Sequence, residues 1–485
     1  MPPPGSSSTA LPSGRGSPHG ESTLALAGVV LVGLSIGVGT SYPLVGAFAI
    51  LGLIVAGSLR TGVDLARIAV LGLVGNIGLS LGPILTDRYG APSATKPIMV
   101  LMLALIAYDM LRRWRLPEMS MAGLGALLLF VAASGASVVV AYRTEVALPG
   151  FVDLVKSALV AIALAALLSS RDILRQASIV VLATLALLAA IGVYQGVTGH
   201  YDVDLWGLAG AQVMHIAGEL DSYRICGPFG DPNLYARILV LAVPLALLEL
   251  YRSPWLAGRV LAGVALAALL GAIAFSFSRG GIVAAIVPLT LMALRMRTDW
   301  RGVLTLSAIC AIVLLVLAPP TLWDRIGAVF GIAGETTSRG SVEDASVDNR
   351  LDEMWVAIVM FLQNPILGVG LDNYPELFQR YTLETAAVLR HEDREAHSLF
   401  LEIAAEQGLL GSVAFAFLLL VVGHGVWRTA QDPTLAVADR DLAFAIGVAI
   451  IGYLGASAFL HDAFAEYFWL FIGMALAVPV ALRSE

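Results

Sequence analysis

The feature that most constrains this chain is a series of apolar stretches, each roughly 17–25 residues long, that recurs from residue 23 to residue 482. Such a stretch can cross the hydrocarbon core of a bilayer as an α-helix, which satisfies its own backbone polar groups there. Hydrophobic residues make up 58% of the chain and charged residues 13%, which is far more apolar than a soluble domain requires. We therefore predict an all-α polytopic membrane protein with about 12–14 transmembrane helices.

The apolar stretches also divide the chain into segments. We expect a disordered, Pro-, Gly- and Ser-rich tail (1–22), N-terminal transmembrane helices (23–196), a short outer loop (197–232), further transmembrane helices (233–319), a large outer loop (320–396) and C-terminal transmembrane helices (397–485). The individual spans are expected near 23–40, 42–58, 64–84, 97–111, 120–141, 152–169, 175–196, 233–251, 256–275, 281–295, 302–319, 397–427, 441–460 and 464–482.

The distribution of arginine orients this bundle, because cytoplasmic loops carry an excess of Lys and Arg. With the N-terminus inside, the outer short loops hold only Arg88, Lys96, Arg143 and Arg279. The two long loops also lie outside, where long loops are translocated whatever their charge. The alternate, cytoplasmic set holds Arg60, Arg112, Arg113, Arg115, Arg171, Arg175, Arg252, Arg259, Arg295, Arg297, Arg301, Arg428, Arg440 and Arg483.

The large outer loop is predicted to be partly helical. Asp348 or Asn349 can cap a helix that continues to Leu362, and Asn364-Pro365 can end it. This helix is amphipathic and is expected to lie at the membrane surface. After it, glycines allow a tight turn, and the next membrane helix is expected to begin near His397. The apolar side of the surface helix is expected to hold Trp355, Ile358, Val359 and Phe361.

Two arginines in predicted outer turns are candidates for binding an anion. Arg224 lies in a Gly/Pro-rich segment, in which Asp231 and Pro232 suit the N-cap and the first position of the next helix. Arg279 lies in the short turn 276–281, where the orientation rule disfavours a cation. A guanidinium held in such a turn can offer a planar fork to a phosphate. The alternatives are a solvated side chain for Arg224 and snorkelling to lipid phosphate for Arg279.

Further polar residues flank the helix that re-enters the membrane. His397 lies at its start, where an imidazole can act as a general base, although a lone histidine is usually an ordinary surface residue. Arg350, on the surface helix, can contact substrate or serve as an interfacial anchor. Glu402 and Glu406 are one turn apart on one helix face and can orient the base or the acceptor, or form a structural salt bridge.

Taken in order, these residues resemble the O-antigen ligase and O-antigen polymerase superfamily. The resemblance covers roughly residues 220–425, and it rests on the ordered set rather than on any single piece. Ser398 departs from the pattern, since many members have Asn after the His. The matching pieces are Arg224-x-x-Gly227-x-x-x-Asp-Pro-Asn233, Ser278-Arg279-Gly280, Arg350-x4-Trp355, Asn364-Pro-Ile-Leu-Gly-Val-Gly370-x-x-Asn373, Ala396-His397-Ser-Leu-Phe-Leu-Glu402 and Glu406-x-Gly-Leu-Leu-Gly411.

The resemblance implies a membrane glycosyltransferase of the GT-C type that uses a glycan carried on undecaprenyl diphosphate, at the periplasmic face of the bacterial inner membrane. It implies no nucleotide sugar, no metal or other cofactor, and no nucleic-acid partner. Arg224, Arg279 and Arg350 are then expected to stabilise charge on the leaving diphosphate, with His397 as the base. Substrate-binding residues are expected to be Arg350, Asn373, Glu402 and Glu406.

These motifs leave the acceptor open. A ligase passes its glycan to a lipid A core or a protein, whereas a polymerase passes it to another lipid-linked repeat. A SEDS-type peptidoglycan polymerase has a similar helix count and carrier, but a different motif set around an outer-loop Asp is expected. A transporter or flippase places ionisable groups near the bilayer midplane, often in repeated halves. Here Lys156 is the main midspan charge and the polar groups gather at the outer face, which favours the enzyme.

Overall fold

The computed structural model describes residues 64–114, 119–216, 219–296, 340–385, 395–458, 460 and 465–483. Within these residues, seven helices are long and apolar enough to cross a membrane, or up to eight if one bent pair counts as a single span. The prediction of an all-α polytopic membrane protein is confirmed. The predicted tail and the predicted spans 23–40, 42–58 and 302–319 lie outside the described residues.

The helices of the bundle begin and end close to most of the predicted boundaries. The largest difference is that α7 begins at Thr144 rather than near residue 152, so Pro149 lies inside it. The predicted span 64–84 is bent by 76° between α3 and the segment Leu81–Arg88, which ends in a π-helical turn. The helices are α3 (Leu65–Gly78), α4 (Leu81–Pro83), α5 (Thr95–Arg113), α6 (Met121–Val139), α7 (Thr144–Leu167), α8 (Arg171–Thr198), α9 (Pro232–Val240), α10 (Val243–Arg252), α11 (Leu256–Phe275), α12 (Arg279–Met296), α17 (Leu399–Gln431), α18 (Val437–Ser457) and α19 (Glu466–Ala481).

The core of the bundle is built around α19. Its sequence is apolar on every side, and such a helix is buried on every side. Trp469 and Phe471 have no exposed surface, and α19 packs against α7 and α17. Rings from neighbouring helices contact it: Phe130 of α6 stacks on Trp469 with 6.1 Å between ring centroids.

Ion pairs show that the loops predicted to be cytoplasmic meet at one end of the bundle, here called the arginine-rich end. Arg252 Nη2 lies 2.5 Å from Asp441 Oδ2, and Arg295 Nε lies 3.0 Å from Asp441 Oδ1. Arg171 Nε contacts Asp439 at 2.6 Å. Because α8, α10, α12 and α18 reach this end together, the predicted alternation of the loops agrees with the fold.

The other end of the bundle carries the two predicted outer loops. The first of them contains a β-hairpin that we did not predict, in which β1 (Ala211–Ile216) pairs with antiparallel β2 (Glu219–Ile225). The pair of residues farthest from the connection between the two strands is Ala211 and Ile225. In the same loop, Asp204 forms an ion pair with Arg88, another residue of the predicted outer set.

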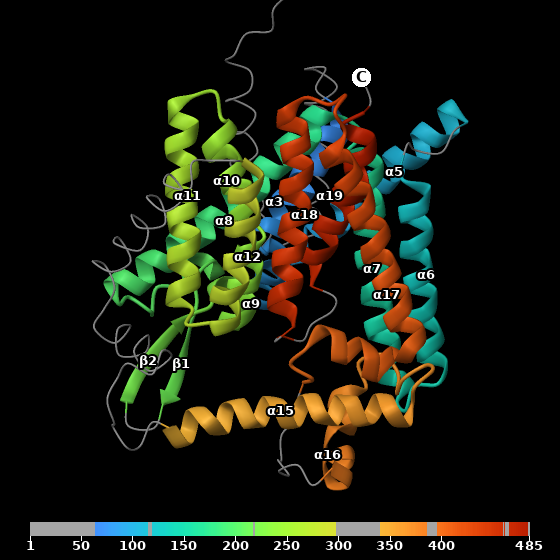
Figure 1. Cartoon of the computed structure of the whole chain (residues 1–485), viewed down its shortest axis with the longest axis vertical. Helices are drawn as coiled ribbons and strands as arrows, with labels where there is room; N and C mark the ends of the chain where they lie inside the picture. Colours follow the sequence, from blue (N-terminus) through green and yellow to red (C-terminus); the bar gives the residue numbers. More distant parts are fainter. Residues whose placement is uncertain are drawn as a thin grey trace, which may run out of the picture.

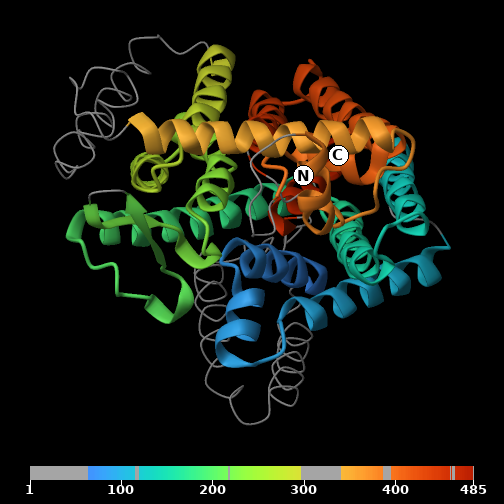
Figure 2. The same cartoon turned by 90° about the horizontal axis from the view of Figure 1, so that it is seen from below.

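Helix α15 (Gly340–Gln363) lies across this second end, roughly perpendicular to the long helices (Figures 1 and 2). It ends before Asn364, as predicted, but it begins at Gly340, so a start capped by Asp348 or Asn349 is wrong. Asp and Asn can also occupy a helical interior, because the tertiary context routinely overrides their weak helix propensity. We call this end the α15 end.

The buried face of α15 differs from the predicted one, and of the predicted residues Val359 packs against its buried cluster. Val356, Ala357 and Met360 are fully buried, together with Glu353, whereas Trp355 is 51% exposed. The positions 353, 356, 357 and 360 form one continuous helical stripe. This stripe packs on α16 (Tyr374–Thr385), where it meets Tyr374 and Phe378, and on α17.

Helix α17 is broken one third of the way along, and the segment after α15 fills the break. Gly408 takes φ 62° and ψ −159°, a conformation essentially restricted to glycine. The freed carbonyls of Ala405 and Glu406 accept from Val369 N and Gly370 N, at 3.0 and 2.9 Å. In return, the N–H groups of Leu409 and Leu410 donate to the carbonyls of Pro365 and Ile366, at 2.7 and 3.1 Å. Four main-chain groups that the break leaves without helical partners are bonded in this way.

Candidate active site

At the α15 end, the structure joins the two predicted arginine turns. Arg224 donates from Nε to the carbonyl of Ser276 at 2.7 Å, and from Nη2 to Asn233 Oδ1 at 3.0 Å. Ser276 belongs to the turn that leads into Arg279. Both acceptors are neutral, so these two contacts orient the guanidinium without neutralising it.

The turn that carries Arg279 is held tightly against α9. Ser278 Oγ accepts from Gly281 N at 3.2 Å, which caps the start of α12. A Cβ added at Gly281 would lie 2.5 Å from Ala236 Cβ, so only glycine allows this approach. Arg279 itself is exposed at the first position of α12, where the helix dipole disfavours a cation but favours a bound anion.

The start of α9 follows the predicted capping pattern. Asp231 is the N-cap, its side chain accepts from Asn233 N at 2.8 Å, and Pro232 occupies the first helical position. The neighbouring Cys226 is buried, and burial raises the pKa of its thiol to about 11. At neutral pH this cysteine is therefore protonated and is not a nucleophile.

His397 lies at the start of α17 and contacts a carboxylate that we did not predict. Its Nε2 is 3.2 Å from Oε2 of Glu353 on α15, and the two side chains are 23% and 3% exposed. His397 takes φ 45°, a left-handed conformation that is uncommon outside glycine. Strained residues of this kind gather at functional sites.

Further acidic residues lie around the same place. Tyr374 is buried, and burial raises the pKa of its phenol; the nearby carboxylates of Glu353, Glu395, Glu402 and Glu406 act in the same direction. Glu402 is 8% exposed and Glu406 is 2% exposed. Glu406 Oε1 accepts from Tyr374 N at 3.1 Å, so this carboxylate caps the start of α16.

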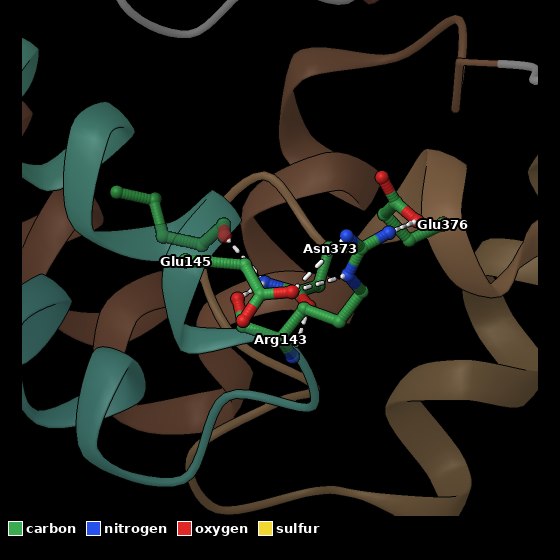
Figure 3. A network of polar contacts seen from close by, with 5 residues as sticks. Arg143, Glu145, Asn373 and Glu376 are labelled. Carbon is green, nitrogen blue, oxygen red and sulfur yellow. Dashed lines mark hydrogen bonds and ion pairs between the residues drawn. The ribbon is translucent and has the colours of Figure 1, made fainter.

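Asn373 is buried and holds a turn of the other half of the bundle (Figure 3). Its Oδ1 accepts from Arg143 N at 2.7 Å, and its Nδ2 donates to the carbonyls of Arg143 and Leu371 at 3.3 and 2.8 Å. The Arg143 guanidinium reaches Glu376 at 2.5 Å and Glu145 at 3.1 Å. The network ties the turn between α6 and α7 to α16.

The structure therefore places the predicted residues in two groups at the same end of the bundle. Arg224 and Arg279 lie on the side of α9 and α12, and His397, Glu402 and Glu406 lie beside α15 and α16 (Figure 1). Arg350 lies in α15, one turn before Glu353. Sequence reasoning missed Glu353 and the contacts of Arg143. Sequence spacing could have indicated Glu353, because positions 353, 356, 357 and 360 have the i, i+3, i+4, i+7 spacing of one buried helix face.

Fold and site together define a polytopic membrane protein with its candidate chemistry at one end of a helix bundle. Residues 264–416 match the family model described as O-antigen ligase. The resemblance to the O-antigen ligase and O-antigen polymerase superfamily is thereby confirmed. The matched region includes Arg279, His397 and Glu353, whereas Arg224 lies before it. A search of the curated proteins gave no match.

Proposed function

We propose that this protein transfers or polymerises a surface-polysaccharide glycan, taking it from undecaprenyl diphosphate and passing it to an acceptor hydroxyl. The proposed place is the periplasmic face of the bacterial inner membrane, which is the α15 end of the bundle. The observation that carries the proposal is that Arg224 is bonded to the turn of Arg279, at the same end as His397.

The two arginines suit the leaving group. Breaking the bond between the anomeric carbon and the diphosphate oxygen leaves negative charge on phosphate oxygens. Arg224 is pre-oriented by the carbonyl of Ser276, and Arg279 projects from the N-terminus of α12, which also favours an anion. Arg350 lies on α15 at the same end and is a further candidate for contacting the carrier.

His397 is the proposed base. The acceptor oxygen forms the new bond to the anomeric carbon, its proton passes to the imidazole, and the diphosphate carrier leaves with the bonding electrons. The contacts of Asn373 and Glu406 support a positioning role for these two residues, because both bond to main-chain groups. Glu402 remains the candidate for contacting the acceptor.

The test uses the purified full-length protein in proteoliposomes that contain a lipid-linked oligosaccharide. Two acceptors are supplied in separate reactions, a lipid A core and a second lipid-linked repeat, so the product distinguishes ligase from polymerase. Formation of a new glycosidic bond is expected. Movement of the intact carrier between leaflets without a new bond would overturn the proposal in favour of a transporter.

A further inference from the structure

We infer that Glu353 is the positioning residue of the proposed base, so that His397 and Glu353 act as a dyad. This inference rests on the proposed glycosyl transfer. The contact joins His397 Nε2 to Glu353 Oε2 at 3.2 Å. At this separation the carboxylate can act on the imidazole through its charge.

The surroundings of Glu353 fix its position. It lies on the buried stripe of α15, beside Val356 and Ala357, both of which have no exposed surface. Its main-chain carbonyl accepts from Tyr374 Oη at 2.7 Å, which anchors this turn of α15 to the start of α16. A carboxylate held on a packed helix keeps an imidazole in one orientation better than a mobile surface side chain does.

The burial of Glu353 strengthens its electrostatic interaction with His397. Its side chain is 3% exposed, and charges interact more strongly away from water. As the acceptor proton reaches the imidazole, the ring becomes an imidazolium, which the carboxylate stabilises without itself taking the proton. The side chains of Glu395, Glu402 and Glu406 also lie in this region, near Tyr374 of α16.

The competing explanation is that the contact only fastens α15 to the start of α17. A neutral amide would then serve as well as a carboxylate, because a glutamine at this position has nearly the same shape and can make the same packing contacts. The two explanations differ in charge rather than in shape. This difference makes Glu353→Gln the decisive substitution.

The experiment compares wild type, Glu353→Gln, Glu353→Asp and His397→Ala in proteoliposomes at matched folded abundance, with Asp352→Asn as the control from the same turn. Glu353→Gln should lower kcat by about 10- to 100-fold, less than the roughly 10²–10⁴-fold cost of losing the base itself, while KM changes little. The acid limb of its pH–rate profile should move to lower pH, because the imidazolium loses its counter-charge. Glu353→Asp should keep the wild-type limb, and Asp352→Asn the wild-type rate.

The double variant Glu353→Gln/His397→Ala shows whether the carboxylate acts through the imidazole. If it does, the double variant should be no slower than His397→Ala alone. A Glu353→Gln protein with the rate and pH profile of wild type would overturn the dyad and leave the proposed function intact. A multiplicative further loss in the double variant would also overturn it. Full activity of His397→Ala would instead show that the proposed base itself is wrong.

Discussion

At the arginine-rich end, the buried carboxylate of Asp441 contacts both Arg252 and Arg295, whereas at the α15 end Arg224 is bonded to a carbonyl and an amide oxygen. The first arrangement neutralises its cations inside the protein. Two of the contacts of Arg224 are to neutral atoms, which set the direction of its guanidinium. An arginine near a loop is therefore not in itself a sign of function in this bundle, because Arg252 and Arg295 are held by a buried carboxylate.

The strongest test of the comparison between the two ends asks which side of the membrane each end faces. An all-or-none result is expected. A reporter fused after Arg301 should be cytoplasmic, and one inserted near Gly340 should be periplasmic, because an excess of arginine marks cytoplasmic loops. Compartment-specific enzymatic reporters measure this directly. The opposite pair of results would place the proposed active site in the cytoplasm.

The largest graded effect is expected at His397. His397→Ala should leave the protein folded and slow glycan transfer by roughly 10²–10⁴-fold, the usual cost of a lost acid–base group. His424→Ala is the matched control, since His424 lies in the same helix α17 and is exposed. Transfer is measured at equal membrane abundance. Full activity of His397→Ala would make a carboxylate such as Glu402 the better candidate for the base.

A somewhat smaller effect is expected at Arg279. Arg279→Ala should lower transfer by roughly 10²–10³-fold, because it removes a contact that strengthens as the leaving group gains charge. Arg279→Lys should not restore the rate, since lysine keeps the charge but lacks the planar fork. Arg259→Ala is the control from the other end, where Arg259 Nε bonds to the carbonyl of Ser253. A fully active Lys variant would reduce Arg279 to a lipid anchor.

The smallest effect on transfer is expected at Asp441, although stability should fall. Asp441→Asn leaves Arg295 and Arg252, whose side chains are 19% and 39% exposed, with a neutral partner. Because these arginines are partly solvated, the expected cost is about 1–3 kcal/mol, below the range for a fully buried pair. Thermal unfolding in detergent measures the loss. The transfer rate per folded molecule should stay within about twofold of the wild-type rate. A much larger drop would show that the arginine-rich end also takes part in transfer.

Much of this fold was predictable because its main signal is local. Long apolar runs gave most of the helices, and the cap at Asp231 and the end of α15 at Asn364 followed from short-range rules. The hairpin β1–β2 was not predictable in this way, since its strands are short and polar residues interrupt their alternation. The buried face of α15 was assigned to its large side chains, whereas packing on α16 selects Val356, Ala357 and Met360.

The candidate site was predictable as a set of residue types but not as a set of contacts. Arg224, Arg279 and His397 were identified from their residue types and their places in predicted outer segments. A cation is disfavoured in a short outer turn, and an imidazole can act as a base. The partners of these residues come from distant segments: Ser276 for Arg224 and Glu353 for His397. Asn373 shows the same limit, since its amide bonds to the main chain of Arg143, far away in the sequence.

The break in α17 gives its outer turns an unusual tolerance. Four hydrogen bonds from the 365–370 segment stand in for those that an unbroken helix would make, and all of them use main-chain atoms. The identity of side chains such as Ile366 therefore matters little to this joint. What it cannot accept is a change of backbone: a Cβ at Gly368 would lie 2.2 Å from the carbonyl carbon of Glu406, and proline at residue 369 would remove a donor. The angle at which α17 presents His397 is thus set largely by glycines and amides, and laboratory evolution can vary an exposed side chain such as Ile366 without redirecting the imidazole.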